Sequence, residues 1–395
     1  MDSERFDVVI AGAGLVGMAL APALARAGLS VALVDRAPIA APEYDPATWD
    51  ARVYAISPGS AVFLRALGAW QLLPADRVTP IEAMRVVGDA GGSLSFSAYD
   101  LSERALAWIV EERALRGALL QGVHDAGVTV VGGMPFVGLA WSAGEGTLTL
   151  GAPGEPPRTL AARLIVGADG VRSWVREAAG IMAQPKPYGQ TAVVANFTCQ
   201  KAHQGEARQW FGRDGGVLAW LPLPGRRISI VWSAPDTLAE ELRALTPEAL
   251  AERVADAGEN ALGKLVPLTA AAGFPLSLLK LPTTIAHRLV LVGDAAHGVH
   301  PLAGQGVNLG FGDAMALAQV EAERGPVTDP GTPLLLERFA RRRVEPVLAM
   351  QAVTDGLARL FGRPAPWLST LRNAGLAAVD RLPLVKRALA QPALR

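Results

Sequence analysis

The feature that most constrains the fold is a glycine-rich loop between a short apolar strand and an Ala/Leu-rich helix. Residues 7–10 (DVVI) predict a buried strand, and residues 18–27 predict a helix. Between them, Gly12, Gly14 and Gly17 form a GxGxxG pattern. A loop of this kind between a strand and a helix is typical of the first β-α-β unit of a dinucleotide-binding fold.

The loop also predicts a phosphate site. Glycines at these spacings let backbone N–H groups and a helix N-terminus approach a pyrophosphate. A second buried strand, residues 31–34, ends at Asp35, whose carboxylate can accept hydrogen bonds from an adenosine ribose. The loop by itself leaves NAD and FAD open as cofactors, and a tight glycine turn without a ligand is the structural alternative.

The composition narrows the class of protein. The 395 residues predict about two domains, and 37 basic against 37 acidic residues disfavour a nucleic-acid binder. The single cysteine, Cys199, excludes an intramolecular disulfide and fits a cytoplasmic protein. We expect neither a secretory signal nor a membrane-spanning helix. The mean hydropathy is nevertheless positive, which is compatible with contact to a membrane surface or with an apolar substrate.

The rest of the chain predicts an α/β fold with an inserted sheet. Residues 80–100 and 191–234 show strand-like runs, and Leu101 to Gly122 shows helical spacing. Two helices are expected near 236–243 and 247–257, and the chain is mostly helical after Gly312. We therefore predict a discontinuous, doubly wound cofactor domain (1–79, 101–180 and 285–330), an antiparallel-sheet substrate domain (80–100 and 181–284) and a C-terminal helical segment (331–395).

Two further motifs favour FAD over NAD. GADGVRS at 167–173 and GDAAH at 293–297 each follow a buried strand, and a simple NAD dehydrogenase would need neither. The aspartates Asp169 and Asp294 can accept hydrogen bonds from cofactor hydroxyls, each worth about 1.5–3 kcal/mol. Residues 304–309 offer backbone N–H groups at an expected helix start, which suits the electron-rich edge of a reduced flavin.

Together these motifs resemble the group A flavoprotein monooxygenases. The resemblance rests on DxR at Asp50 and Arg52, on GADGVRS and on GDAAHxxxPLAGQGVNLG at 293–310, and it extends from residue 6 to about residue 390. The ubiquinone-biosynthesis hydroxylases are the most similar branch. Their features here are DxRxxAxS at 50–57, VEER at 110–113 and the C-terminal segment 371–386.

The resemblance implies a non-covalently bound FAD and an NAD(P)H- and O2-dependent hydroxylation of an aromatic ring, with NAD(P)H as a transient co-substrate. The implied substrate is a polyprenylated phenol. Cofactor contacts are implied for Gly12, Gly14, Gly17, Asp35 with Arg36, Arg52, Arg113, Asp169, Asp294, Pro301, Gly304, Gln305, Gly306, Val307 and Asn308. Asp169 would also contribute to binding the nicotinamide. No general base stands out, so the sequence assigns no catalytic residue.

Some features depart from this pattern or have other readings. Glu112 stands where the branch usually has Asn, and residues 311–313 (FGD) replace a common Leu-Arg-Asp. Asp294, His297 and His300 have the spacing of metal ligands, but they lie inside the flavin motif, and we expect no metal site. Cys199 is expected to be a core residue.

The C-terminal segment and the activity each have alternatives. From residue 356 onward, seven basic residues and one acidic residue are mixed with Leu, Val and Trp367, which fits either a membrane-surface element or ordinary helical packing. A quinone-synthesis complex is a second candidate partner. The rival functions are an FAD hydroxylase of small soluble phenols, an FAD-dependent prenyl-chain reductase and a non-catalytic FAD-bound subunit of such a complex.

Overall fold

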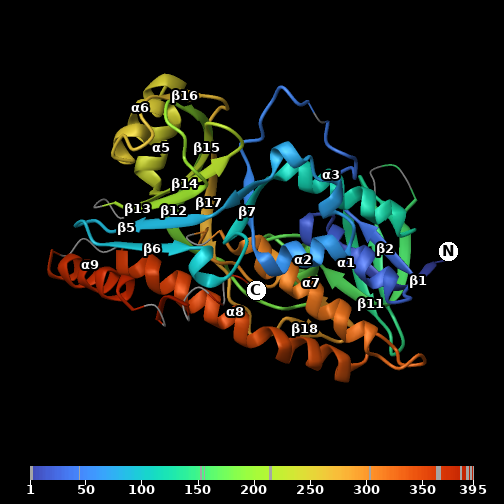
Figure 1. Cartoon of the computed structure of the whole chain (residues 1–395). Helices are drawn as coiled ribbons and strands as arrows, with labels where there is room; N and C mark the ends of the chain where they lie inside the picture. Colours follow the sequence, from blue (N-terminus) through green and yellow to red (C-terminus); the bar gives the residue numbers. More distant parts are fainter. Residues whose placement is uncertain are drawn as a thin grey trace.

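A largely parallel sheet around the glycine loop organises the computed structural model of this chain (Figure 1). The structure describes all residues except 1–2, 44, 152–153, 155, 213–215, 302–303, 362–365, 383–384, 388–390, 392–393 and 395. The predictions that rest on Leu302, on Ala303 and on the side chain of Trp367 lie outside the described part.

The first sheet has the predicted β-α-β unit at its centre. Its order is β18 (Ile285–Ala286), β19 (Leu289–Leu291), β11 (Arg158–Gly167), β1 (Glu4–Ala11), β2 (Val31–Val34) and β8 (Thr129–Val131). The strands from β19 to β8 are parallel, and β18 pairs antiparallel with β19. β1 thus has β2 on one side and β11 on the other. Its carboxyl end is a topological switch point, where α/β sheets bind ligands.

Both faces of this sheet are buried, which explains why its strands are continuous apolar runs. Val8 and Ile10 pack on one side of the sheet, and Val9 and Ala11 pack on the other, as strand alternation requires. The first side is covered by α1 (Leu15–Arg26), α2 (Pro58–Ala66), α3 (Glu112–Asp125) and α7 (Gly306–Ala322). The second is covered by α4 (Trp174–Ala178) and by β9 (Phe136–Trp141) and β10 (Gly146–Leu150), which join the same sheet through the pairing of β10 with β11.

The second sheet joins the two strand-rich regions predicted at 80–100 and 191–234. Its order is β16 (Leu265–Pro267), β12 (Lys186–Cys199), β15 (Arg227–Pro235), β14 (Val217–Leu223), β13 (Glu206–Phe211), β5 (Ala83–Val87) and β6 (Ser93–Ser97), and β17 (Ala272–Leu278) also pairs with β12. The pairs are antiparallel except β13 with β5, which is parallel. α5 (Asp236–Ala244) and α6 (Pro247–Ala257) cover its outer face, where both were expected.

A small third sheet corrects one prediction. Its order is β3 (Val53–Ile56), β7 (Ala107–Glu111) and β4 (Thr79–Ile81). The helical prediction for Leu101 to Gly122 was wrong over β7, because these residues pair with strands on both sides and the helix begins only at Glu112. Pairing partners distant in sequence outweighed the local pattern.

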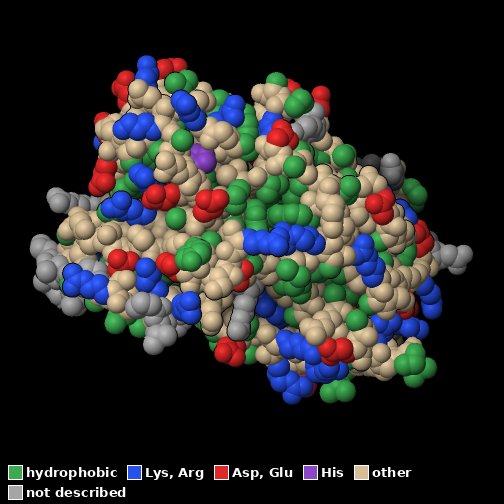
Figure 2. Space-filling model, in the orientation of Figure 1, with side chains coloured by type: hydrophobic (Ala, Val, Ile, Leu, Met, Phe, Trp, Pro, Cys, Tyr) green, Lys and Arg blue, Asp and Glu red, His purple; other side chains and the backbone are tan. Residues whose placement is uncertain are grey.

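Figure 2 shows hydrophobic side chains gathered on the visible surface between the two main parts of the molecule.

Short 3-10 turns complete the connections, and α8 and α9 make up most of the described part of the C-terminal segment. The turns are η1 (Trp70–Leu72), η2 (Ala75–Arg77), η3 (Tyr99–Leu101) and η4 (Gly293–Ala295). α8 (Pro333–Phe361) runs along the lower edge of the molecule in Figure 1, and α9 (Pro366–Asp380) lies against β6. Cys199 is buried in the core of the second sheet. The predicted α/β fold class is confirmed, and the domain limits stay a prediction.

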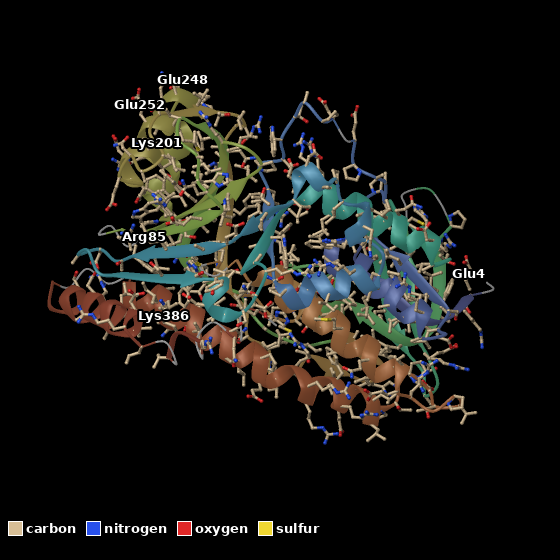
Figure 3. The ribbon with its side chains drawn as sticks, viewed as in Figure 1. Glu4, Arg85, Lys201, Glu248, Glu252 and Lys386 are labelled. Atoms are coloured by element: carbon tan, nitrogen blue, oxygen red, sulfur yellow. The ribbon has the colours of Figure 1, made fainter. Side chains whose placement is uncertain are left out.

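The C-terminal cations are largely used for packing. Arg372 forms a buried ion pair with Asp89, and the Lys386 ammonium lies 5.9 Å from the centre of the Phe96 ring in β6. Figure 3 shows Lys386 below this strand. The Arg387 Nη2 donates to the Asp100 carbonyl at 2.9 Å. In the described part of the chain, no helix is long and apolar enough to span a bilayer.

Candidate functional site

The glycine loop brings the carboxyl ends of β1 and β11 into close contact. Gly12 has φ = 115°, and a Cβ built on it would lie 2.3 Å from the Ala168 carbonyl oxygen. A Cβ on Gly17 would lie 2.0 Å from the Gly12 oxygen. Gly14 differs from both, because nothing lies within 4 Å of its Cβ position. Gly12 and Gly17 therefore allow the loop to form, whereas Gly14 faces open space.

The open space lies at the amino end of α1. Gly14 is the N-cap residue, with φ = −76° and ψ = 179°, and it has no side chain to accept hydrogen bonds from the first turn. The N–H groups of that turn and the helix dipole therefore favour an anion here. This geometry fits the pyrophosphate of a dinucleotide.

Asp35 follows β2 and fixes the same loop. Its Oδ2 accepts a hydrogen bond from the Ala13 N–H at 2.6 Å, and its Oδ1 accepts one from the Ala37 N–H at 2.8 Å. The residue is half-buried, so these oxygens keep lone pairs toward solvent. Arg36 is exposed beside it. A ribose hydroxyl could donate to Asp35 without breaking either loop contact.

The DxR segment ties the cofactor side to the amino end of α3. The Asp50 carboxylate accepts from the Arg52 N–H at 2.9 Å and from the Arg113 N–H at 3.1 Å. The Arg113 side chain turns toward the preceding loop, where its Nη1 donates to Thr48 Oγ1 at 2.8 Å. Asp50 thus has a structural role in addition to its place in the motif.

Sequence reasoning missed the buried pair beneath this segment. Glu111 and Arg77 are 1% and 4% exposed, and their side chains form an ion pair at 3.0 Å. The other Glu111 oxygen accepts from the Asp50 N–H at 2.6 Å. Glu111 occurs in the VEER segment, but the distance of Arg77 along the chain hid their contact.

The Asp169 carboxylate is hydrogen-bonded within its own loop. Its carboxylate accepts hydrogen bonds from the Ser173 hydroxyl and, at 3.1 Å, from the Val175 N–H at the start of α4. Burial raises the pKa of Asp169, although these hydrogen bonds act in the opposite direction. The nearby Arg176 is buried and donates to the Ala295 carbonyl at 3.0 Å. Because Arg176 also donates to the Val171 carbonyl at 3.0 Å, it bridges GADGVRS and GDAAH, which are far apart in sequence.

Asp294 reaches solvent although protein surrounds it closely. Its side chain is exposed, yet the dense surrounding protein raises its pKa through desolvation, against the opposing effect of His297 and Arg52. The charge of Asp294 also contributes to raising the pKa of Tyr54, after the larger effect of burial. Arg52, Tyr54 and Asp294 therefore lie close enough for their charges to interact.

A buried network holds the Asp294 loop from behind. Asp313 Oδ2 accepts from the Gly293 N–H at 2.8 Å and lies 2.6 Å from His297 Nε2, while Oδ1 accepts from Arg343 Nε at 2.6 Å. Burial alone would raise the pKa of Asp313, but these partners lower it overall. His297 is therefore a hydrogen-bond partner of Asp313. His300 Nε2 lies 2.8 Å from Gln190 Oε1. Within the described residues, no group of His, Cys, Asp and Glu could hold a metal ion.

The amino end of α7 faces the same region. α7 begins at Gly306, where a Cβ would meet nothing within 4 Å, and Gly304 has φ = 61°. The Gly304 N–H donates to the Pro301 carbonyl at 2.9 Å. This turn exposes Gly304, leaves Val307 half-buried and buries Gln305. The start of α7 therefore offers backbone rather than side chains to a ligand.

The side chain of Asn308 is used within the protein. Its Nδ2 donates to the Ala55 carbonyl at 2.8 Å, and its Oδ1 accepts from the Ser57 N–H at 2.9 Å. The side chain is thereby used to fasten α7 to the junction of β3 and α2. Any contact of Asn308 with a flavin would come from its backbone.

These features fit FAD. Two helix N-termini with unobstructed glycines, together with Asp35 and the exposed Asp294, fit a ligand that carries a diphosphate and hydroxyl groups. FAD would supply reducible flavin chemistry when bound.

Comparisons with known proteins agree with this geometry. The model of a family described as "FAD binding domain" matches residues 5–353. The chain is 38% identical to ubiquinone hydroxylase UbiL of Rhodospirillum rubrum, covering 96% of this chain and 87% of the relative. It is 32% identical to 3-demethoxyubiquinol 3-hydroxylase of Escherichia coli, covering 98% of each.

A solved structure supports the fold. PqsL of Pseudomonas aeruginosa, in complex with 2-aminobenzoylacetate, superposes with a TM-score of 0.77 at 24% identity, covering 94% of this chain and 99% of that chain. At that identity the likeness concerns the fold alone. From the family match and the two relatives, the chain belongs to the FAD binding domain family and is an FAD-dependent monooxygenase related to the ubiquinone-biosynthesis hydroxylases.

Proposed function

We propose that this protein hydroxylates the aromatic ring of a polyprenylated phenol in ubiquinone biosynthesis, with O2 and NAD(P)H as co-substrates. The names of the two relatives supply the substrate class. The observation that carries the proposal is an apolar, incompletely covered patch on one face of the second sheet, formed by Ala219, Leu221 and Val231.

That face can be derived from strand alternation. Leu218 and Trp220 of β14 pack in the core beneath α5 and α6. Ala219 and Leu221 must therefore point to the opposite face, and Leu221 contacts the cluster that includes residues of β4 and β7. Val231 of β15 is paired with Ala219 and shares this face.

These three side chains are only partly covered, although they lie on a central part of the sheet. All are apolar, so the surface would accept an aromatic ring without having to desolvate a charge of its own. The third sheet, against which this face packs, is fastened to α7 by Asn308. The proposed ring site therefore lies on the side of the flavin that the start of α7 would border.

We further propose roles for the cofactor residues. Gly12, Gly14 and Gly17 would admit the diphosphate, and Asp35 with Arg36 would bind the adenosine. Arg52 and Arg113 would serve the phosphates and ribityl chain, together with Asp294. Pro301, Gly304, Gln305, Gly306, Val307 and Asn308 would cover the flavin ring through backbone groups. Asp169 would have to give up loop contacts before its carboxylate could bind a nicotinamide.

The protein would collect its substrate at a membrane surface. A polyprenyl chain partitions into lipid, because each buried CH2 contributes about 0.8 kcal/mol. Since Lys386 and Arg387 are used in packing, the surface-facing candidates at the C-terminal end are Arg381, Leu382 and Val385, all of them exposed. A cation beside two apolar side chains suits an anionic membrane surface.

Product analysis in a strain that lacks the protein tests the proposal. The strain should accumulate a prenylated phenol that is one ring oxygen short of the next intermediate. Reintroducing the wild-type chain should clear that compound, whereas the Gly14→Val variant should not. In vitro, the same phenol should stimulate NAD(P)H oxidation and oxygen uptake by the purified protein.

Two outcomes would contradict the proposal. Stimulation by small soluble phenols, with no quinone precursor accumulating in the strain, would indicate another hydroxylase. An accumulating precursor with no phenol-dependent NAD(P)H oxidation would indicate a non-catalytic subunit.

A further inference from the structure

Arg52, at the edge of the proposed cofactor cleft, forms an ion pair with Glu112. The Arg52 Nε is 3.0 Å from Glu112 Oε2, and the two side chains are 47% and 24% exposed. The guanidinium carbon also lies 5.4 Å from the centre of the Tyr54 ring and 5.3 Å from that of Phe274. One carboxylate and two aromatic rings thus hold the cation, from α3, β3 and β17.

Glu112 occupies a position that disfavours its charge. Desolvation by burial raises the pKa of its carboxyl, and the nearby charge of Asp50 acts in the same direction. Arg52 and Arg116 lower the pKa, but the net shift is upward. The ion pair with Arg52 therefore compensates the charge of Glu112 only in part.

Other acidic groups converge on the same place. After the dominant effect of burial and the opposing effect of Arg52, the pKa of Tyr54 is raised by Glu112, Asp294 and Asp50. The phenol of Tyr54 is therefore neutral. Three carboxylates already surround Arg52 before an anionic cofactor arrives, and Glu112 is the one that contacts its guanidinium at ion-pair distance.

A diphosphate entering this cluster would compete with Glu112 for Arg52. This competition depends on the proposed role of Arg52 in binding the FAD phosphate. Charge-assisted hydrogen bonds from a guanidinium are strong with either partner, and a phosphate accepts both of its N–H edges. If Glu112 lost Arg52 as its partner and gained the dianionic diphosphate as a neighbour, the charged form of Glu112 would be further disfavoured.

We propose that Glu112 is a displaceable counter-ion of Arg52, which releases the arginine to the FAD diphosphate and takes up a proton from solvent as the cofactor binds. In the bound state the carboxyl is then neutral and remains near Arg52 as a hydrogen-bonding group. The Asn that is usual at this position in the ubiquinone-biosynthesis branch could not do this, because an amide does not titrate.

The sign of the pH dependence follows from linkage. A group whose pKa is higher in the complex than in the free protein makes binding tighter as the pH falls through the higher value. Well above that value, Glu112 is charged in both states and opposes the diphosphate. FAD should therefore bind more tightly on going from about pH 8 to about pH 5.5.

The test uses apoprotein titrated with FAD by calorimetry, in two buffers of different ionisation enthalpy. The difference between the two binding enthalpies counts the protons taken up. Wild type should take up protons in the acidic range, and Glu112→Gln should take up fewer and lose most of the pH dependence. At about pH 8, Glu112→Gln should bind FAD about two- to fivefold more tightly, the size expected for one partly exposed charge pair.

Matched variants identify the source of the protons. Asp294 also faces the cleft with a raised pKa, so Asp294→Asn should retain the Glu112-dependent uptake. The Asp50 carboxylate already accepts hydrogen bonds from the N–H groups of Arg52 and Arg113. Thermal unfolding of each apoprotein shows whether a variant is folded before its binding is interpreted.

The outcomes separate this inference from the site assignment on which it rests. If Arg52→Met leaves the FAD affinity unchanged, Arg52 does not bind the cofactor. The site assignment and the counter-ion proposal are then both refuted. If Arg52→Met weakens binding but Glu112→Gln keeps wild-type proton uptake, the displaceable counter-ion is refuted and the site stands. Weaker binding by Glu112→Gln at about pH 8 would also refute it, because Glu112 would then be holding Arg52 ready for the phosphate.

Discussion

Replacing Gly14 with valine should remove FAD without unfolding the protein. Gly14 has an extended backbone that any residue can adopt, and nothing lies within 4 Å of its Cβ position. The new side chain would therefore meet no protein atom close to its Cβ. It would project into the space in front of α1, where the diphosphate is expected.

The magnitude can be estimated from the contacts that the ligand would lose. A hydrogen bond between a backbone N–H and a charged group contributes about 1.5–3 kcal/mol. Displacing the diphosphate from one or two N–H groups of the first turn should thus weaken binding between about tenfold and about 10⁴-fold. Helix-dipole stabilisation falls off within one turn, so its loss adds to this.

Gly17→Ala is the matched control. Its Cβ would lie 2.0 Å from the Gly12 carbonyl oxygen, so loop and helix would have to move apart. Such overpacking costs about 1–3 kcal/mol of folding free energy. Apoprotein of Gly17→Ala should therefore unfold at lower denaturant concentration than wild type, whereas Gly14→Val should match wild type.

The assay is FAD fluorescence quenching with apoprotein, beside urea unfolding monitored by circular dichroism. Normal FAD affinity of Gly14→Val would show that the diphosphate lies elsewhere. A large loss of stability in the same variant would show that the space around Gly14 is not open.

The remaining predictions concern the cofactor, the buried network and the C-terminal surface. Acid or heat denaturation should release free FAD into the supernatant, and flavin that stays with the precipitated chain would contradict non-covalent binding. Asp313→Asn should lower the free energy of unfolding by about 3–5 kcal/mol in urea melts, because it leaves His297 and Arg343 without their buried carboxylate. Since the pKa of Asp313 is lowered from 3.8 in the folded state, its stabilisation is present above that pH and lost below it, and only wild type should show this loss. Arg381→Glu should reduce sedimentation with anionic liposomes in a salt-sensitive manner at unchanged FAD content, and equal binding would leave the segment as packing alone.

The sequence was most informative where structure is determined locally. The glycine loop, α1 and β2 were predicted within a few residues, because strand and helix periods and the glycine stop are local signals. The backbone conformation at Gly12 and the open position at Gly14 are what the motif requires. Aspartates that follow apolar strands were likewise found, because the end of a buried strand is visible in the sequence.

What the sequence could not predict are the partners of those residues. β7 was taken for helix because its pairing with β3 and β4 involves segments distant in sequence. Asn308 was expected to contact the flavin through its backbone, and the sequence did not show that its side-chain amide joins β3 and α2. The count of basic residues treated Lys386 and Arg387 as cations available to a membrane surface. In the structure they contact β6 and η3.

The same limit explains why the Asp294 loop could be located but not its support. The carboxylate that holds this loop, Asp313, lies in α7, and its partner Arg343 lies in α8. Because one carboxylate contacts both the Gly293 N–H and His297, a shift of α7 would move the loop that presents Asp294. α7 also begins at the glycine turn proposed to cover the flavin. One helix therefore sets the relative position of two proposed cofactor contacts, and substitutions of Asp313, or of its partner Arg343 in α8, should alter FAD binding without touching the cofactor.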